Sequence, residues 1–134
     1  MQLKAFGILL IVCICLVQGV QVDAWAAPAK TRIPIEIRSV GDDGLSSRFD
    51  AYLRRAFRSS EEFVEAPSVD SSRLIVTIPT NVRWKKVGRR TEVSYAVEFT
   101  SADGKLISSS SGSCWDKRLN DCAQQVLKAA RAVR

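Results

Sequence analysis

Large apolar side chains alternate with polar ones over residues 30–40. Ile33, Ile35 and Ile37 take every second position, which is the period of a strand with one buried face. Pro34 cannot donate a hydrogen bond to a neighbouring strand, so this strand lies at an edge of the sheet or begins near the proline. We therefore predict a first strand over this stretch.

The spacing of apolar residues changes after a Gly-Asp-Asp-Gly sequence at residues 41–44, which breaks the strand and offers a helix cap. Apolar side chains then recur at helical spacing, on one face of a helix: Leu45, Phe49, Tyr52, Leu53, Ala56 and Phe57. Residues 59–72 are rich in serine and glutamate, and we expect a polar connection there.

Alternation returns over residues 74–84 and 93–99 and predicts two strands. A hairpin that turns at Val87-Gly88 brings their apolar partners to one face, and a slip by one residue would separate them. The pairs in this register are Val76 with Phe99, Ile78 with Val97, Thr80 with Tyr95, Val82 with Val93 and, on the other face, Arg83 with Glu92.

A second turn is predicted at Asp103-Gly104, the strongest hairpin signal in the chain. The strand after this turn pairs with the strand before it: Phe99 with Ser108, Val97 with Ser110, Tyr95 with Gly112 and Val93 with Cys114. The serines at 108–111 could instead form a flexible linker, but the stretch between Ile107 and Cys114 is short for one, so we favour a strand.

A closing helix is predicted from apolar residues at helical spacing, with Asp116 as its cap. Its apolar stripe consists of Leu119, Cys122, Ala123, Val126, Leu127, Ala130 and Val133. The element order β-α-β-β-β-α predicts an α+β fold, a two-layer sandwich with a mainly antiparallel sheet and both helices on one face. The outer face of that sheet would carry Arg83, Glu92, Glu98, Ile107 and Trp115.

The first 26 residues have the layout of a signal peptide. Lys4 precedes thirteen consecutive uncharged residues, and the small residues Ala24 and Ala26 suit a cleavage site. We therefore predict a signal peptide over residues 1–26 and one small domain over residues 27–134. The alternative is an uncleaved anchor. The apolar stretch is followed by further uncharged residues, some of them polar, and together they approach the length that spans a bilayer.

Export affects the expected oxidation state of Cys114 and Cys122, because an oxidising compartment favours disulfides. The predicted register points Cys114 toward the helices, and Cys122 lies on the apolar stripe of the closing helix, so both sulfurs face the same layer. We predict a disulfide between them, and the alternative is a pair of buried free thiols. Their spacing is not that of a redox pair, and two sulfurs without histidine do not make a metal site.

Composition narrows the classes of function. The chain has 134 residues, of which 46% are hydrophobic and 25% charged, and this fits one folded domain. It has no histidine, so the usual general base of hydrolases and the commonest zinc ligand are missing. The sequence contains no phosphate-binding loop and no nucleophile elbow. We therefore expect a protein that is not an enzyme and that uses no cofactor or metal.

The net charge of +6 belongs to the predicted mature domain, because residues 1–26 contain one cation and one anion. Its densest cluster is the first hairpin, where five cations lie within eight residues. The candidate anion-binding residues are Arg83, Lys85, Lys86, Arg89 and Arg90, with Trp84 among them. The alternative is a solvated hairpin whose charges keep strand edges apart. Other cations, such as Lys117 and Arg118, are interpreted as a diffuse field and not as a site.

The element order over residues 33–133 resembles that of small bacterial envelope accessory domains, namely the lipopolysaccharide-assembly lipoprotein LptE and the amino-terminal domain of TolB. This resemblance implies a non-catalytic binding or assembly component of the envelope. It carries over no functional residue, and the sequence lacks the lipid-attached cysteine of an LptE-like lipoprotein.

We therefore expect a periplasmic or secreted domain whose basic hairpin binds an anionic envelope component, lipid or lipopolysaccharide, or an envelope protein. An exported protein does not normally meet nucleic acid, which we do not expect as a partner. The alternative is a protein-binding or inhibitor-like module that uses a sheet edge or the exposed Ile107 and Trp115. An enzyme without histidine would need a pocket lined by carboxylates with a perturbed pKa.

Overall fold

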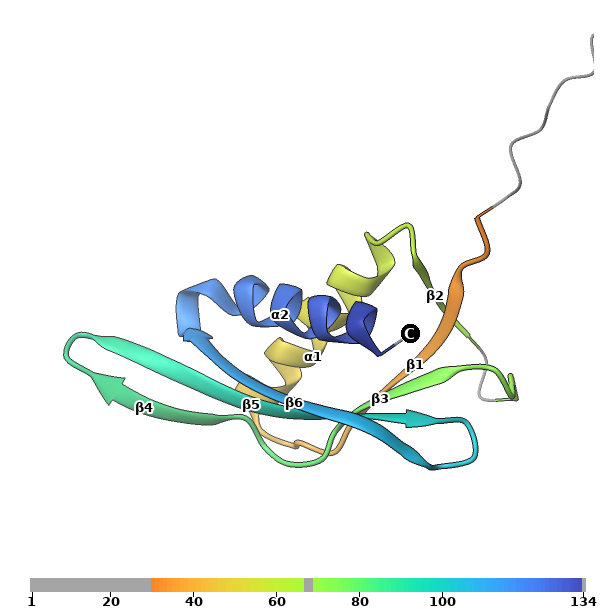
Figure 1. Cartoon of the computed structure of the whole chain (residues 1–134). Helices are drawn as coiled ribbons and strands as arrows, with labels where there is room; N and C mark the ends of the chain where they lie inside the picture. Colours follow the sequence, from red (N-terminus) through yellow and green to blue (C-terminus); the bar gives the residue numbers. More distant parts are fainter. Residues whose placement is uncertain (1–29, 67–68, 134) are drawn as a thin grey trace, which may run out of the picture.

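The computed structural model describes residues 30–66 and 69–133, so the predicted signal peptide lies outside the described residues. Six strands form one sheet, and both helices lie on the same side of it (Figure 1). The elements are, in order, β1 (Ile33–Ser39), α1 (Gly44–Arg58), β2 (Phe63–Glu65), β3 (Leu74–Ile78), β4 (Arg83–Val87), β5 (Arg90–Ser101), β6 (Leu106–Trp115), the 3-10 turn η1 (Asp116–Arg118) and α2 (Leu119–Ala132). The predicted α+β class is confirmed.

The sheet is mixed: the three pairings of β5 are antiparallel, as predicted for a mainly antiparallel sheet, and the two pairings of β1 are parallel. β1 pairs in parallel with β2 on one side and with β3 on the other. The segment predicted as a polar connection contains β2, a three-residue strand that is too short to show a period in the sequence. Phe63 is the one buried residue of β2, and its side chain joins the core opposite Ile33.

β1 is an inner strand, so the prediction that it lies at an edge is wrong and the alternative, a strand that begins near the proline, is correct. Pro34 is the second residue of the strand, and the pairing with β3 begins one residue later, at Ile35. The residue without an N–H group therefore precedes the ladder that it would otherwise interrupt.

The alternating stretch predicted as one strand over residues 74–84 consists of two strands, β3 and β4, which both pair with β5. The pairs that test the register are Val76 with Phe99 in β3, and Trp84 with Val93 and Lys85 with Glu92 in β4. β3 keeps the predicted register, but β4 is displaced by two residues, because the segment between the strands turns inward. There the buried Val82 donates its N–H to the Ser46 hydroxyl of α1 over 2.9 Å.

The β5–β6 hairpin has the predicted register, and all four predicted pairs are observed. Gly104 in its turn has a φ of +85°, in the left-handed region that favours glycine. A bulge next to Thr100 leaves Ile107 between two paired positions of β6. The serine-rich stretch is thus a strand and not a linker.

The core lies between the sheet and the helices. Phe49 of α1 stacks on Tyr95 of β5 with ring centroids 5.2 Å apart, and the Tyr95 hydroxyl donates to Gln125 of α2 over 3.0 Å. Burial raises the pKa of Tyr95, so its hydroxyl keeps the proton that it donates. Gly112 of β6 lies against this ring, and a Cβ atom there would come within 2.5 Å of the Tyr95 hydroxyl. The close approach of the two groups explains the glycine.

α1 begins at the predicted cap. Asp43 accepts a hydrogen bond from the N–H of Ser46 over 2.6 Å, and this bond lowers the pKa of Asp43. The predicted cap of the second helix is wrong, because Asp116 is the first residue of η1 and no side-chain hydrogen bond caps η1 or α2 in the described residues. A turn that leads directly out of β6 sets the start of α2.

Replacing Ser46 by alanine is expected to lower the free energy of unfolding by about 1–2 kcal/mol, because it leaves the N–H of Val82 without its acceptor. Ser46 is fully buried, whereas the adjacent Ser47 is exposed and provides a matched control. Urea unfolding of the two alanine variants measures the difference, and Ser47→Ala is expected to change little. Equal losses would show that the Ser46 hydroxyl does not hold the segment before β4.

Candidate anion-binding site

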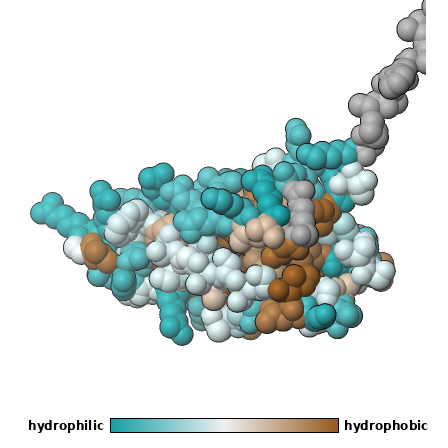
Figure 2. Space-filling view, viewed as in Figure 1, coloured by the Kyte–Doolittle hydropathy of each residue, from teal (hydrophilic) through white to brown (hydrophobic). Residues whose placement is uncertain are grey.

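The β4–β5 hairpin extends beyond the ends of both helices (Figure 1). Every residue of β4 is exposed, and this end of the molecule has a mostly hydrophilic surface (Figure 2). The hairpin turns at Gly88-Arg89, one residue later than the predicted Val87-Gly88, because Val87 is still a strand residue and pairs with Arg90. Gly88 has a φ of +60°. The predicted cations therefore stand on a projecting hairpin.

The structure separates some of the predicted anion-binding residues from the others. Lys85 lies on the sheet face away from the helices, and its ammonium pairs with Glu92 at 3.1 Å. This contact, together with a hydrogen bond to Ser113, holds the pKa of Glu92 below its usual range. Arg83 lines a separate hollow of about 290 Å³, and Trp84 is 61% exposed and lies outside the lining of that hollow.

The other three hairpin cations line a pocket of about 520 Å³ between the hairpin and η1. We call this pocket the basic cleft. Its first wall is Lys86, Arg89 and Arg90 of the hairpin, its second wall is Lys117 and Arg118 of η1, and Trp115 also lines it. The two cations of η1 were expected to belong to a diffuse field, and the fold brings them into one site with the hairpin.

Trp115, and not Trp84, is the aromatic side chain of the cleft. The Arg90 guanidinium lies over its ring, 5.4 Å from the centroid, in a cation–π contact. Trp115 was predicted to be exposed on the outer face, but it is half-buried, because Arg90 lies over its ring. The alternation of apolar and polar residues along one strand could not predict this contact, because the contact joins residues of two different strands.

Positive charge in the basic cleft is largely uncompensated. Asp116 is the one carboxylate in the lining, against five cations. Arg118 forms an ion pair with Asp121 at 2.8 Å. Within residues 30–66 and 69–133, neither Arg89 nor Lys117 forms an ion pair. The cleft therefore has an excess of cations with donors available to an anion.

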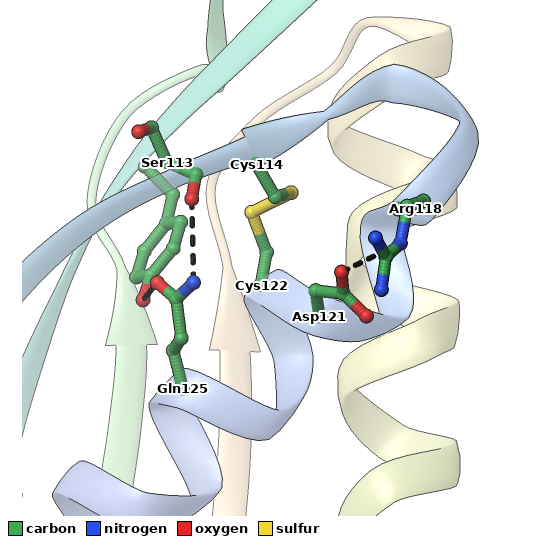
Figure 3. Close-up of a disulfide and its surroundings, with 7 residues drawn as sticks. Ser113, Cys114, Arg118, Asp121, Cys122 and Gln125 are labelled. Atoms are coloured by element: carbon green, nitrogen blue, oxygen red, sulfur yellow. Dashed lines mark hydrogen bonds and ion pairs between the residues drawn. A yellow bond between two sulfur atoms is a disulfide. The ribbon is translucent and has the colours of Figure 1, made fainter.

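A disulfide joins the end of β6 to the first turn of α2 (Figure 3). Cys114 and Cys122 are bonded with their Cα atoms 5.6 Å apart, which confirms the predicted bridge. Gln125 adds a second contact between the same elements by donating to the Ser113 carbonyl over 3.3 Å. Because η1 lies between the two cysteines, the bridge holds the second wall of the cleft beside the hairpin.

The part of the chain that the structure describes contains no group of three His, Cys, Asp or Glu side chains that could hold a metal ion. No helix among the same residues is long and apolar enough to cross a bilayer.

Comparisons with known proteins find a weak structural similarity and no sequence relative. No protein-family model matches the chain, and no curated protein matches it in sequence. A crystal structure of a minor lipoprotein from Acinetobacter baumannii is similar, with a TM-score of 0.49 and 10% sequence identity, over 77% of this chain and 94% of that chain. At this level of similarity no residue of the neighbour is transferred to this chain.

Proposed function

We propose that this chain is an exported, non-enzymatic domain that binds an anionic component of the cell envelope, a lipid or lipopolysaccharide, through its β4–β5 hairpin. The observation that carries this proposal is the cluster of cations on the exposed β4–β5 hairpin, three of which line the basic cleft. Uncompensated positive charge in a hollow attracts anions from solution and from membrane surfaces. The signal-peptide layout of residues 1–26 supports a periplasmic or secreted location.

The chemistry of the described residues favours binding over catalysis. The chain contains no histidine to move a proton near neutral pH. Both described cysteines are joined in the disulfide, so neither supplies a thiolate nucleophile. Asp116 is the one carboxylate in the lining, so the cleft does not contain the pair of carboxylates that serves as acid and base in many hydrolases. A ligand in this cleft is therefore held by charge and released unchanged, without a cofactor.

Neutralising the hairpin is expected to weaken binding to anionic vesicles by about tenfold or more at low ionic strength. The variant replaces Lys85, Lys86, Arg89 and Arg90 by glutamine. Each of these cations adds attraction to an anionic surface, and salt screens that attraction. Co-sedimentation with vesicles of phosphatidylglycerol and phosphatidylcholine, and with lipopolysaccharide, measures binding at two salt concentrations.

A matched control removes two lysines and two arginines from other exposed positions, namely Arg32, Arg48, Lys105 and Lys128. This control has the same net charge as the hairpin variant and is expected to keep most of the binding. Equal loss in the two variants, or no binding by the unaltered protein at low salt, would contradict a role of the hairpin.

The alternative function is protein binding at the edge of the sheet. Among the described strands β6 pairs with β5 alone, so its other side is an edge. Leu106 and Ile107 at the start of β6 are 56% and 48% exposed, as predicted for Ile107. An unpaired edge can accept a strand from a partner protein. A stoichiometric protein partner whose binding is insensitive to salt would favour this alternative.

A further inference from the structure

We infer that the basic cleft is a site for a compact polyvalent phosphate, such as a pyrophosphate or a headgroup with two phosphates, bound between both walls. This inference rests on the proposed function. It adds η1 to the site and sets the size and charge of the ligand. The proposed function needs only the hairpin, whereas a ligand between the walls also needs Lys117 and Arg118.

The charges in the lining favour a polyvalent anion. Five cations and one carboxylate line the cleft, so a monovalent anion would leave most of the positive charge uncompensated. Two linked phosphates concentrate several negative charges in one small group. Arginine donates paired hydrogen bonds to phosphate oxygens and lysine acts as a point charge, and each wall contains both residue types.

The volume of the cleft limits the size of the ligand. About 520 Å³ lies within the range of small-molecule sites, so the cleft is large enough to hold a headgroup or a free phosphate compound. An extended anionic polymer would instead lie along the exposed face of β4, where Lys85 already pairs with Glu92. The two walls therefore suit a compact group better than a long chain.

One cation in each wall of the cleft is restrained by a contact of its own. The Arg90 guanidinium lies over the Trp115 ring, and Asp121 holds Arg118 at 2.8 Å. The disulfide closes the segment that contains the second wall (Figure 3). Side chains that are already restrained lose less conformational freedom when a ligand binds. Two of the five cations, Arg90 and Arg118, are therefore held in place before a ligand binds.

Isothermal titration calorimetry of the purified protein with sodium pyrophosphate at low salt tests this inference. We expect one saturable site. In the variant Lys117→Gln/Arg118→Gln, binding should be weaker by about tenfold, because two charge-assisted contacts are lost while the hairpin is unchanged. The matched control Arg48→Gln/Lys128→Gln removes one arginine and one lysine from exposed positions of the helices and is expected to weaken binding by less than about twofold.

Equal weakening in the two double variants would show a diffuse field and would overturn the site, as would the lack of a saturable heat. Vesicle binding that is lost in the hairpin variant but kept in Lys117→Gln/Arg118→Gln, without pyrophosphate binding, would overturn the cleft and leave the proposed function intact.

A competition experiment identifies the source of the phosphate once pyrophosphate binds. Vesicles of phosphatidylglycerol and phosphatidylcholine are added to the protein with and without saturating pyrophosphate. Displacement of the protein from the vesicles would assign the cleft to a lipid headgroup. Unchanged vesicle binding beside intact pyrophosphate binding would assign the cleft to a free phosphate compound.

Discussion

Replacing Phe49 by alanine is expected to lower the free energy of unfolding by about 3–5 kcal/mol. Phe49 is 0% exposed, and its ring stacks on Tyr95 with centroids 5.2 Å apart. The loss combines the transfer free energy of the buried ring with the cavity that its removal leaves between α1 and the sheet. It is a large fraction of the roughly 5–15 kcal/mol that stabilises a typical domain. Guanidinium unfolding followed by circular dichroism measures it.

Tyr52 provides the control for this prediction. It lies on the same helix and is half-buried, and the Arg55 guanidinium lies 5.6 Å from its ring centroid. Because part of its ring already meets solvent, Tyr52→Ala is expected to cost less than about 2 kcal/mol. If both substitutions cost the same, Phe49 is not the main contact between α1 and β5.

Removing the Cys114–Cys122 disulfide is expected to lower the free energy of unfolding by about 2.6 kcal/mol, because the bridge closes a loop of about nine residues in the unfolded chain. For a domain of this size the corresponding decrease in Tm is roughly 10–20 °C. Differential scanning calorimetry of the variant Cys114→Ala/Cys122→Ala measures the change.

Reductant provides the control for the disulfide. The unaltered protein in reductant should approach the Tm of the double variant, while the double variant itself should not respond. Labelling of both thiols in the denatured protein without reductant would refute the bridge. Below the Tm of both forms, the double variant should also bind pyrophosphate more weakly, because η1 lies within the loop that the bridge closes.

Much of the fold could be predicted because side-chain periods are local properties of the chain. α1 and α2 lie where their apolar stripes predicted them, and β6 pairs with β5 in the expected register. β2 could not be predicted, since it has three residues and one buried side chain, Phe63. The parallel pairing around β1 was also missed, because it depends on where the chain returns after α1.

The candidate site could be predicted in part. The hairpin cations are adjacent in the sequence, and three of them, Lys86, Arg89 and Arg90, line the cleft. The position of Lys85 opposite Glu92 could not be predicted, because it follows from the two-residue shift of β4. That shift accompanies the hydrogen bond between Val82 and Ser46, which are far apart in the sequence.

Local patterns were enough to identify the α+β class, the β5–β6 turn, the position of the β4–β5 turn to within one residue, the disulfide partners and the dense positive charge of the hairpin. Each of these depends on residues that are close along the chain or on the side-chain period of one element. The parallel strands around β1, the register of β4 and the second wall of the basic cleft needed the folded chain. These three features depend on contacts between segments that are distant in the sequence. The side-chain period of a single element does not determine whether such segments meet.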